Sequence, residues 1–329
     1  MKNKKKVIIV LGEPNSVFIE ILSKVLSKNI YKKKIKYPLI LIGSKNLLIS
    51  QLKLLKKKIN FEELKIKNFQ SKRLQNKTYL IDINYKFKHP FEKISYKSKK
   101  YISGCFKIAF KYLNSRKANI VINGPVSKEH FLSKLYPGVT EYVFKNTKKK
   151  ISKKPVMLIY NKKLSVSPLT THIALKDVSK QINQKLIINN VLAINDFYKK
   201  KLNIIPNIAL MGLNPHCESK SKFNEEKRII KPAIIKLKKR KISISGPFSA
   251  DTFFLKENIK NYQSIVGMYH DQVLTPFKTI FNFDASNITL GLPFMRLSVD
   301  HGPNERMLGK NKSNTKSLEN IFDFIHSLK

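Results

Sequence analysis

Short runs of β-branched and aliphatic residues alternate along this chain with longer segments of helical periodicity. The short runs predict strands at residues 7–11, 39–42, 118–122, 156–160, 208–211 and 242–245. The longer segments predict helices at residues 18–27, 92–115, 176–200, 225–239 and 317–328. Strands separated by helix-length segments form parallel sheets with right-handed crossovers, so the alternation predicts an α/β fold.

Length and composition indicate a folded chain that needs neither a disulfide framework nor a membrane. Its 329 residues, 42% of them hydrophobic, suffice for about two domains. The two cysteines, Cys105 and Cys217, are too few for a disulfide scaffold, which is typical of a reducing compartment. No apolar run approaches the roughly 20 residues that span a bilayer, and the run at residues 7–11 is too short for a signal peptide. We therefore expect a cytoplasmic protein that inserts into no membrane.

The strongly basic charge suggests an anionic partner. Lys and Arg number 65 and Asp and Glu 21, which gives a formal net charge of +44. Only six of the basic residues are Arg, the usual residue for bidentate phosphate and guanine contacts, and the lysines are spread along the whole chain. Nucleic-acid binding is therefore the less favoured interpretation, whereas attraction of anionic small molecules is expected.

Candidate chemistry appears where predicted strands end in unusual turns, because ligands of α/β sheets bind outside the carboxyl ends of the strands. His172, His216 and His270 all lie at such transitions. Three imidazoles gathered there would suit a divalent metal with open coordination positions. Separations of 44 and 54 residues leave open the alternative that each is an isolated loop or core histidine. Asp271, beside His270, is a candidate to orient that ring.

Residues 286–302 contain no lysine, although the chain is rich in it. The polar members of this segment, Asn287, Arg296, Asp300 and His301, are candidates to orient an anionic ligand and a cofactor, with Lys278 adding a second positive charge. A buried hairpin that carries an ion pair is the alternative interpretation.

Six motifs, in order, resemble those of the 4-hydroxythreonine-4-phosphate dehydrogenase family of vitamin B6 biosynthesis. They are Asn-Gly-Pro-Val-Ser-Lys at 123–128, Thr-His-Ile at 171–173, Gly-Leu-Asn-Pro-His at 212–216, Gly-Pro with Ala-Asp-Thr at 246–252, Met-Tyr-His-Asp-Gln at 268–272, and residues 287–302. The resemblance extends from about residue 7 to the C-terminus.

The resemblance implies a fold similar to that of isocitrate and isopropylmalate dehydrogenases. Two α/β domains with parallel and mixed sheets would flank a cleft, one formed by residues 1–125 and 288–329 and the other by residues 126–287. It also implies a homodimer with active sites at the subunit interface. The chain has no Gly-x-Gly-x-x-Gly fingerprint, and its cofactor-binding residues stay unassigned.

The resemblance also assigns roles to individual residues. It implies that His172, His216 and His270 bind a divalent zinc, magnesium or cobalt ion, with one ligand supplied by the partner subunit. It further implies that the substrate is contacted by Thr140, Lys278, Asn287 and Arg296. The candidate catalytic residues are Asp251 and Lys278. The proton acceptor is Asp251 or a metal-bound water.

The implied reaction oxidises 4-phosphooxy-L-threonine with NAD or NADP and decarboxylates the product to 3-amino-2-oxopropyl phosphate. The chain departs from the family at Val139, where members usually have a histidine next to Thr140. The first loop, Gly12 to Val17, is also poorer in glycine than is usual. A related dehydrogenase of a phosphorylated sugar acid, such as 4-phospho-erythronate or threonate, is therefore the alternative function.

Overall fold

The chain folds into two compact units. The computed structural model describes residues 5–71, 74–133, 135–148, 154–218 and 223–328. The first unit comprises residues 1–151 and 292–327, and the second comprises residues 152–291 and 328–329. The α/β class predicted from the alternating pattern is confirmed, because each unit contains a sheet with helices between its strands.

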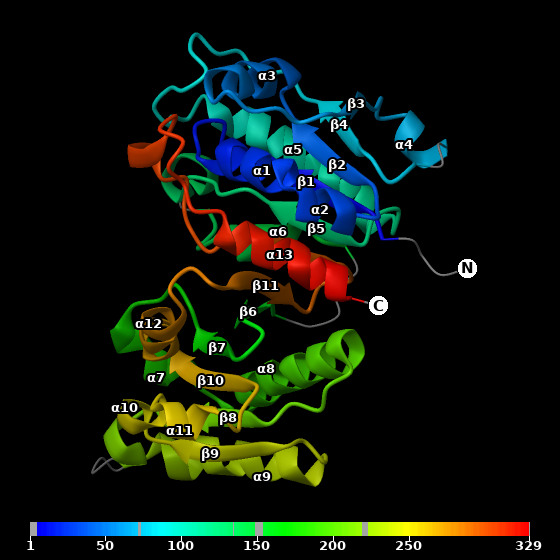
Figure 1. The fold of residues 1–329 in the computed structure, drawn as a ribbon. Helices are drawn as coiled ribbons and strands as arrows, with labels where there is room; N and C mark the ends of the chain where they lie inside the picture. The colour runs from blue at the N-terminus through cyan, green and yellow to red at the C-terminus, as the bar shows by residue number, and fades with distance from the viewer. Residues whose placement is uncertain (1–4, 72–73, 134, 149–153, 219–222, 329) are drawn as a thin grey trace. The chain divides into compact units, whose positions relative to one another are not determined.

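In the first unit, the strands of the described residues all run parallel, in the spatial order β3, β4, β2, β1, β5, β12. Figure 1 labels the first five of these strands. Their bounds are β1 Val7–Val10, β2 Leu39–Gly43, β3 Glu62–Glu63, β4 Thr78–Asp82, β5 Ile120–Asn123 and β12 Met295–Ser298. Every residue of β1, β2 and β5 is buried. Strands covered on both faces need continuous apolar runs, which is why these three strands were predictable from the sequence.

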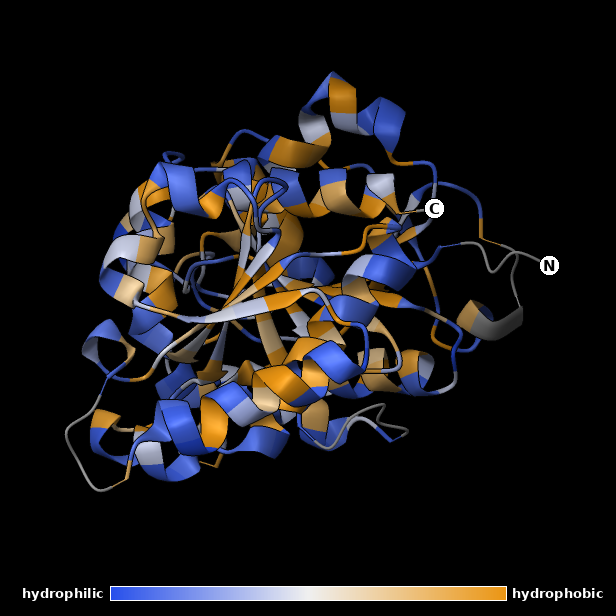
Figure 2. Ribbon diagram, turned by 90° about the horizontal axis from the view of Figure 1, so that it is seen from below, coloured by the Kyte–Doolittle hydropathy of each residue, from blue (hydrophilic) through white to orange (hydrophobic). Residues whose placement is uncertain are grey.

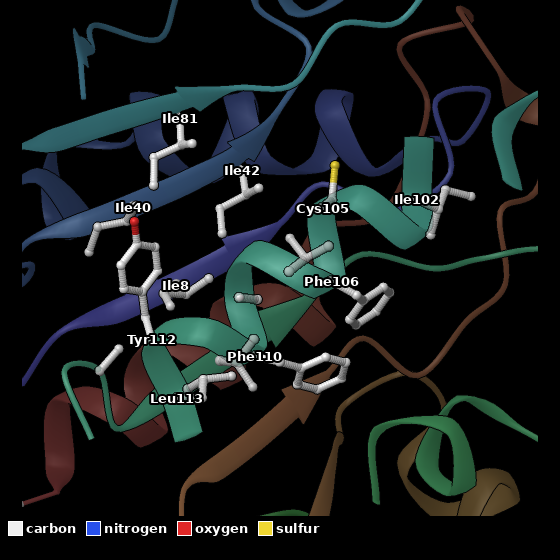
Figure 3. Packing of buried hydrophobic residues seen from close by; sticks show 14 of the residues in the cluster. Ile8, Ile40, Ile42, Ile81, Ile102, Cys105, Phe106, Phe110, Tyr112 and Leu113 are labelled. Carbon is white, nitrogen blue, oxygen red and sulfur yellow. The ribbon is translucent and has the colours of Figure 1, made fainter. Parts of the chain in front are cut away.

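The helices of the first unit follow from amphipathic segments between these strands. They are α1 Phe18–Ser27, α2 Asn29–Lys34, α3 Lys45–Leu54, α4 Asn68–Ser71, α5 Ser98–Asn114, η1 Lys128–Leu132, α6 Val139–Asn146, η6 Glu305–Met307 and α13 Lys316–Ser327. Figure 3 shows α5 packed against the sheet, with Phe106 and Tyr112 of the helix in the same buried cluster as Ile8 and Ile40. This cluster joins α5 to the strands of the first unit.

The second unit contains a mixed sheet in the order β11, β6, β7, β10, β8, β9 within its described residues. The bounds are β6 Val156–Tyr160, β7 Ser165–Thr170, β8 Ile208–Met211, β9 Ile244–Phe248, β10 Ser264–Tyr269 and β11 Ser286–Leu290. Strand β6 pairs antiparallel with both β11 and β7, whereas β7, β10, β8 and β9 are mutually parallel. Four carboxyl ends therefore lie along one edge.

Helices and short turns connect the strands of the second unit. They are η2 Leu175–Asp177, α7 Val178–Gln181, α8 Gln184–Phe197, η3 Tyr198–Leu202, η4 Pro215–Cys217, η5 Glu226–Ile230, α9 Lys231–Lys239, α10 Ala250–Phe253, α11 Lys256–Ile259 and α12 His270–Phe281. Val273, Leu274 and Phe277 of α12 are buried in one cluster with Val166 of β7 and Ile265 of β10. Figure 2 shows hydrophobic strands and hydrophilic residues on the outer helices. No helix of the described chain is long and apolar enough to cross a membrane.

Several boundaries differ from those expected from the sequence. Residues 92–97 precede α5 rather than belonging to it, and the helix expected at 176–200 is divided into four pieces. The compact units meet in the chain at residues 151/152 and 291/292, and the domain boundaries expected from the sequence are 125/126 and 287/288. Phe131, Leu132 and Val143 account for this difference, because they lie in the hydrophobic core of the first unit.

Candidate functional site

The candidate metal ligands and Asp251 follow consecutive strands at the carboxyl edge of the second unit's sheet. In the spatial order β7, β10, β8, β9, the residues beyond the strand ends are His172, His270, His216 and Asp251. Thr170 and Tyr269 are register partners, so the chain leaves β7 and β10 at the same level. Parallel pairing therefore gathers residues that are almost 100 positions apart in the sequence.

His172 and His270 form the first pair at this edge. The centroids of their rings lie 6.1 Å apart. His270 is the first residue of α12, and its Nδ1 lies 2.6 Å from Oδ1 of Asp271. A carboxylate at this distance fixes the orientation of the ring and favours the tautomer that leaves Nε2 available as a ligand.

His216 and Asp251 form the second pair. Nδ1 of His216 lies 3.9 Å from Oδ2 of Asp251, and the side chain of His216 is 78% exposed. The hydroxyl of Ser249 donates to Oδ1 of Asp251. This hydrogen bond, together with the charge of His216, lowers the pKa of Asp251. Asp251 is therefore an anion at neutral pH beside an imidazole.

The backbone at His216 is unusual for a residue with a side chain. Its φ is 53°, and φ of Cys217 is 59°, which places two consecutive residues in the left-handed region. Each such residue costs on the order of 1–3 kcal/mol and persists only where its surroundings over-determine the conformation. Contacts outside the loop must therefore hold it.

Glu226 and Gln272, neither of them a predicted site residue, hold this loop. Oε1 of Glu226 accepts hydrogen bonds of 2.9 Å from the backbone N–H groups of Leu213 and Asn214. Nε2 of Gln272 donates to the carbonyl of Gly212 over 2.7 Å, while its Oε1 accepts from the N–H of Met268. The only sequence signal for Glu226 is its acidity in a chain where basic residues outnumber acidic ones threefold.

The donor chemistry of the edge fits a divalent metal. A metal ion lies about 3.2 Å from the centroid of an imidazole that binds it at about 2.1 Å, so two rings on one tetrahedral ion have centroids about 5.2 Å apart. The rings of His172 and His270 are about 0.9 Å farther apart than this. Within one chain, the described residues contain no group of three or more His, Cys, Asp or Glu side chains placed to hold an ion. The structure thus joins two of the three candidate ligands and places His216 with Asp251.

In the first unit, Arg296 of β12 is buried among polar partners. Its Nε donates to Oδ1 of Asn123 over 2.8 Å, and its Nη1 donates to Oγ1 of Thr140 over 2.9 Å. Burial lowers the pKa of Arg296 to about 10, although the nearby charge of Glu141 opposes the decrease. The guanidinium therefore stays protonated at neutral pH. Asn123, at the end of β5, was not among the predicted site residues.

The other candidate substrate residues lie in different elements. Lys278 is half-buried in α12, and Asn287 is half-buried in β11. Oδ1 of Asn287 accepts no hydrogen bond from the described residues. Thr140 and Arg296 thus belong to the first unit, whereas Lys278 and Asn287 belong to the second. Val139 begins α6, where its side chain packs against the core of the first unit.

Comparison with known proteins identifies the family. The model of the family described as pyridoxal phosphate biosynthetic protein PdxA matches residues 34–324. The chain belongs to the PdxA family. A relative from Sulfurihydrogenibium sp. (strain YO3AOP1), named 4-hydroxythreonine-4-phosphate dehydrogenase, is 37% identical over 316 residues, which cover 95% of this chain and 94% of that protein.

Solved structures agree with membership of the PdxA family. A 4-hydroxythreonine-4-phosphate dehydrogenase from Klebsiella pneumoniae superimposes with a TM-score of 0.80 at 26% identity, over 98% of each chain. A β-decarboxylating dehydrogenase from Thermococcus kodakarensis shares the fold alone, with a TM-score of 0.52 at 9% identity over 98% of this chain and 83% of that one. The predicted fold class is therefore confirmed.

One further relative has a different printed activity. A protein from Pectobacterium atrosepticum, named D-threonate 4-phosphate dehydrogenase, is 35% identical over 202 residues, which cover 60% of this chain and 61% of that protein. Relatives of this PdxA-family chain are thus named dehydrogenases of two different phosphorylated acids.

Proposed function

We propose that this chain is a 4-hydroxythreonine-4-phosphate dehydrogenase that uses NAD or NADP and a divalent metal. The carbon that bears the secondary hydroxyl of 4-phosphooxy-L-threonine transfers a hydride to the nicotinamide, and the hydroxyl releases its proton as the C=O bond forms. The resulting β-keto acid then loses carbon dioxide and takes up a proton to give 3-amino-2-oxopropyl phosphate. The observation that carries the proposal is the pair His172 and His270 at the carboxyl edge of a PdxA-family sheet.

The metal would be held by His172, His270 and His216, with one of these imidazoles supplied by a partner subunit. Zinc, magnesium and cobalt are the candidate ions. When bound, such an ion supplies a Lewis acid that favours ionisation of the substrate hydroxyl. Asp251 is an anion within reach of His216, so it can accept the released proton directly or through water.

Two cations are suited to the acidic ends of the substrate. Arg296 presents a planar guanidinium that Asn123 and Thr140 hold in one orientation, which suits bidentate contact with a carboxylate or phosphate. Lys278 supplies a compact positive charge for the other group and is the second candidate catalytic residue. Oδ1 of Asn287, which lacks a donor among the described residues, can accept a hydrogen bond from the substrate.

A homodimer with shared active sites belongs to the same proposal. Leu175 and Leu255 follow β7 and β9 at the carboxyl edge of the second unit, and each exposes more than three fifths of its surface. Large apolar side chains beside a functional edge are typical of an interface. We also place the reaction in the cytoplasm, with support from the free thiols of Cys105 and Cys217.

D-Threonate 4-phosphate is the alternative substrate. It differs from 4-phosphooxy-L-threonine at C2, where a hydroxyl replaces the amino group. Val139 favours this alternative, because its apolar side chain offers no hydrogen bond beside Thr140. A related protein with the corresponding name supports it as well.

NADH formation by the purified dimer tests the proposal. We expect turnover of 4-phosphooxy-L-threonine with NAD, loss of turnover after chelation, and recovery when zinc, magnesium or cobalt is restored. His216→Ala should lower kcat/KM by at least about 100-fold, because one of three ligands is lost. A preference for D-threonate 4-phosphate would establish the alternative. Chelator-resistant turnover, or full activity of the variant, would refute the metal assignment.

A further inference from the structure

The loop that presents His216 is held from one side by a buried carboxylate. Glu226 is 1% exposed and lies at the start of η5, ten residues beyond His216. Its Oε1 accepts from the N–H groups of both Leu213 and Asn214, at 2.9 Å each. Its Oε2 accepts from Nδ2 of Asn214 at 3.0 Å. Three hydrogen bonds thus fix the two residues that lead into Pro215 and His216.

This carboxylate stays charged in spite of its burial. Burial alone would raise the pKa of Glu226, but the hydrogen bonds from the backbone and side chain of Asn214 and from Leu213 lower it below its usual value. Hydrogen bonds to an ionised acceptor are about twice as strong as neutral ones. Glu226 therefore holds the loop more firmly than a neutral side chain would.

The loop is also anchored at its first residue, Gly212, where it packs closely against Cys217. Gln272 binds the carbonyl of Gly212, and the N–H of Gly212 donates to the carbonyl of Phe248. A Cβ at Gly212 would lie 2.6 Å from Sγ of Cys217, so the turn folds back tightly on its own start. With Gly212 anchored, the contacts of Glu226 decide the direction in which the left-handed turn at His216 continues.

We infer that Glu226 is a positioning residue that fixes residues 213–214 and thereby holds the imidazole of His216 in the orientation that binds a divalent cation. This inference rests on the proposed function. Glu226 touches neither the substrate nor the ion, and it acts through the backbone of the loop. Partners of this kind around metal ligands typically contribute 10- to 100-fold in metal affinity.

Glu225 supplies a matched control. Its Oε2 accepts from Nδ2 of Asn214 at 3.1 Å, with no backbone N–H bonded to it in the described loop. Glu225→Gln and Glu226→Ala therefore remove the same charge at adjacent positions beside the same loop. A purely electrostatic effect on metal affinity would be similar in both variants, whereas a positioning effect would be confined to residue 226.

Titration of the metal-free dimer with Co²⁺ tests the inference, with calorimetry for affinity and visible absorption for ligand geometry. We expect Glu226→Ala to weaken Co²⁺ binding by about 10- to 100-fold and to change the absorption spectrum. Glu226→Gln keeps an acceptor for the two N–H groups, so it should restore most of the affinity lost in Glu226→Ala. Glu225→Gln should stay within about twofold of the unsubstituted protein, and urea unfolding would identify any variant that fails to fold.

The inference fails on any of the following results. Unchanged Co²⁺ affinity and spectrum in folded Glu226→Ala would overturn it, as would a loss in Glu225→Gln as large as the loss in Glu226→Ala. If Glu226→Ala does not fold, Glu226→Asp decides, because it keeps the charge but shortens the reach to the two N–H groups, and an affinity equal to that of the unsubstituted protein would overturn the inference. His216→Ala separates this failure from failure of the proposed function: if its Co²⁺ binding equals that of the unsubstituted protein, His216 is no ligand and both conclusions fall.

Hydrogen exchange at residues 213 and 214 reports the same contacts without metal. We expect these amides to be protected in the unsubstituted protein and in Glu225→Gln, and to exchange at least about tenfold faster in Glu226→Ala, because their acceptor is gone. Equal exchange in all three proteins would show that Glu226 does not hold the loop.

Discussion

At the scale of single residues, Glu13 is a buried carboxyl outside the proposed reaction. It follows β1 in the first unit and is 2% exposed. Burial raises its pKa to about 7, and the charge of Glu305 adds to this, while hydrogen bonds from Ser98 and the backbone of Asn15 oppose it. Oε1 of Glu13 has no hydrogen-bond partner among the described residues. The folded protein therefore binds a proton here more tightly than the unfolded chain does.

This raised pKa predicts that stability falls as the pH rises. The contribution of Glu13 to the free energy of unfolding is complete below about pH 4.5, the pKa of this carboxyl in the unfolded chain. It is lost as the pH rises through about 7, the pKa in the folded protein. The free energy of unfolding should decrease by on the order of 3 kcal/mol between pH 5 and pH 8 from this group. Urea unfolding of Glu13→Gln at both pH values should show most of that decrease removed.

The exposed Glu63 of β3 provides the comparison. Glu63→Gln removes an exposed carboxylate that pairs with Lys45, so it controls for the loss of one acidic charge without burial. An unaltered slope in Glu13→Gln would contradict the assignment to Glu13.

Residue chemistry was only partly predictable from the sequence. His172, His216 and His270 were identifiable because each follows a strand run, a pattern that needs no knowledge of contacts. The left-handed backbone of His216 and the support from Glu226 were not, because both depend on a segment ten residues away that folds back on the loop. Burial of Glu13 likewise has no local signature.

At the scale of elements, strongly amphipathic or fully buried segments were the predictable ones. Helix α1 has the bounds expected from its periodicity, and β6 and β8 do as well. Helix α12 was not predicted, since Pro276 interrupts its pattern and removes an N–H from the helix interior. Buried contacts of Val273 and Phe277 stabilise α12 in spite of the proline.

Gly104 gives a prediction for α5, the helix that covers the core of the first unit. A methyl group there would meet only Cγ2 of Ile83, at 3.6 Å, which is ordinary contact. Gly in a helix interior is about 0.5–1 kcal/mol less stable than Ala. Gly104→Ala should therefore raise the free energy of unfolding by about that amount, as measured by urea denaturation.

Gly302→Ala serves as the comparison for Gly104→Ala. A Cβ at Gly302 meets nothing within 4 Å, and this residue lies outside any helix. The free energy of unfolding of Gly302→Ala should differ from that of the unsubstituted protein by less than about 0.5 kcal/mol. A lower free energy of unfolding in Gly104→Ala would show that α5 packs too tightly at this position to accept a methyl group.

At the scale of the whole molecule, the excess of positive charge predicts a salt-dependent affinity for the anionic substrate. A charge of +44 raises the local concentration of small anions, and salt screens this effect beyond about 10 Å at 0.1 M. We expect KM for 4-phosphooxy-L-threonine to rise by about three- to tenfold between 20 and 200 mM KCl, with kcat nearly constant.

Initial rates of NADH formation over that salt range provide the measurement. A salt-independent KM would show that the lysines have no effect on substrate capture. Strong salt-dependent DNA binding that survives His172→Ala would instead favour the nucleic-acid interpretation of the charge.

The whole-molecule architecture was predictable as a class. Alternating strands and helices predicted the α/β fold, and the ordered motifs identified the family. The boundary between the units depends on where η1 and α6 pack. Phe131 and Val143 decide this through contacts with the core around Phe106, which no local pattern records.

The first unit has a discontinuous chain, and this affects the order in which the molecule can be completed during translation. Strand β12 pairs with β5, and α13 packs beside α1, yet both come from residues beyond 292. A ribosome that has made residue 291 has already supplied every described strand of the second unit. At that stage β12 has not yet been synthesised, so the nascent first unit exposes the edge of β5. Chaperones that shield unpaired strands would therefore have their substrate at Ile120–Asn123.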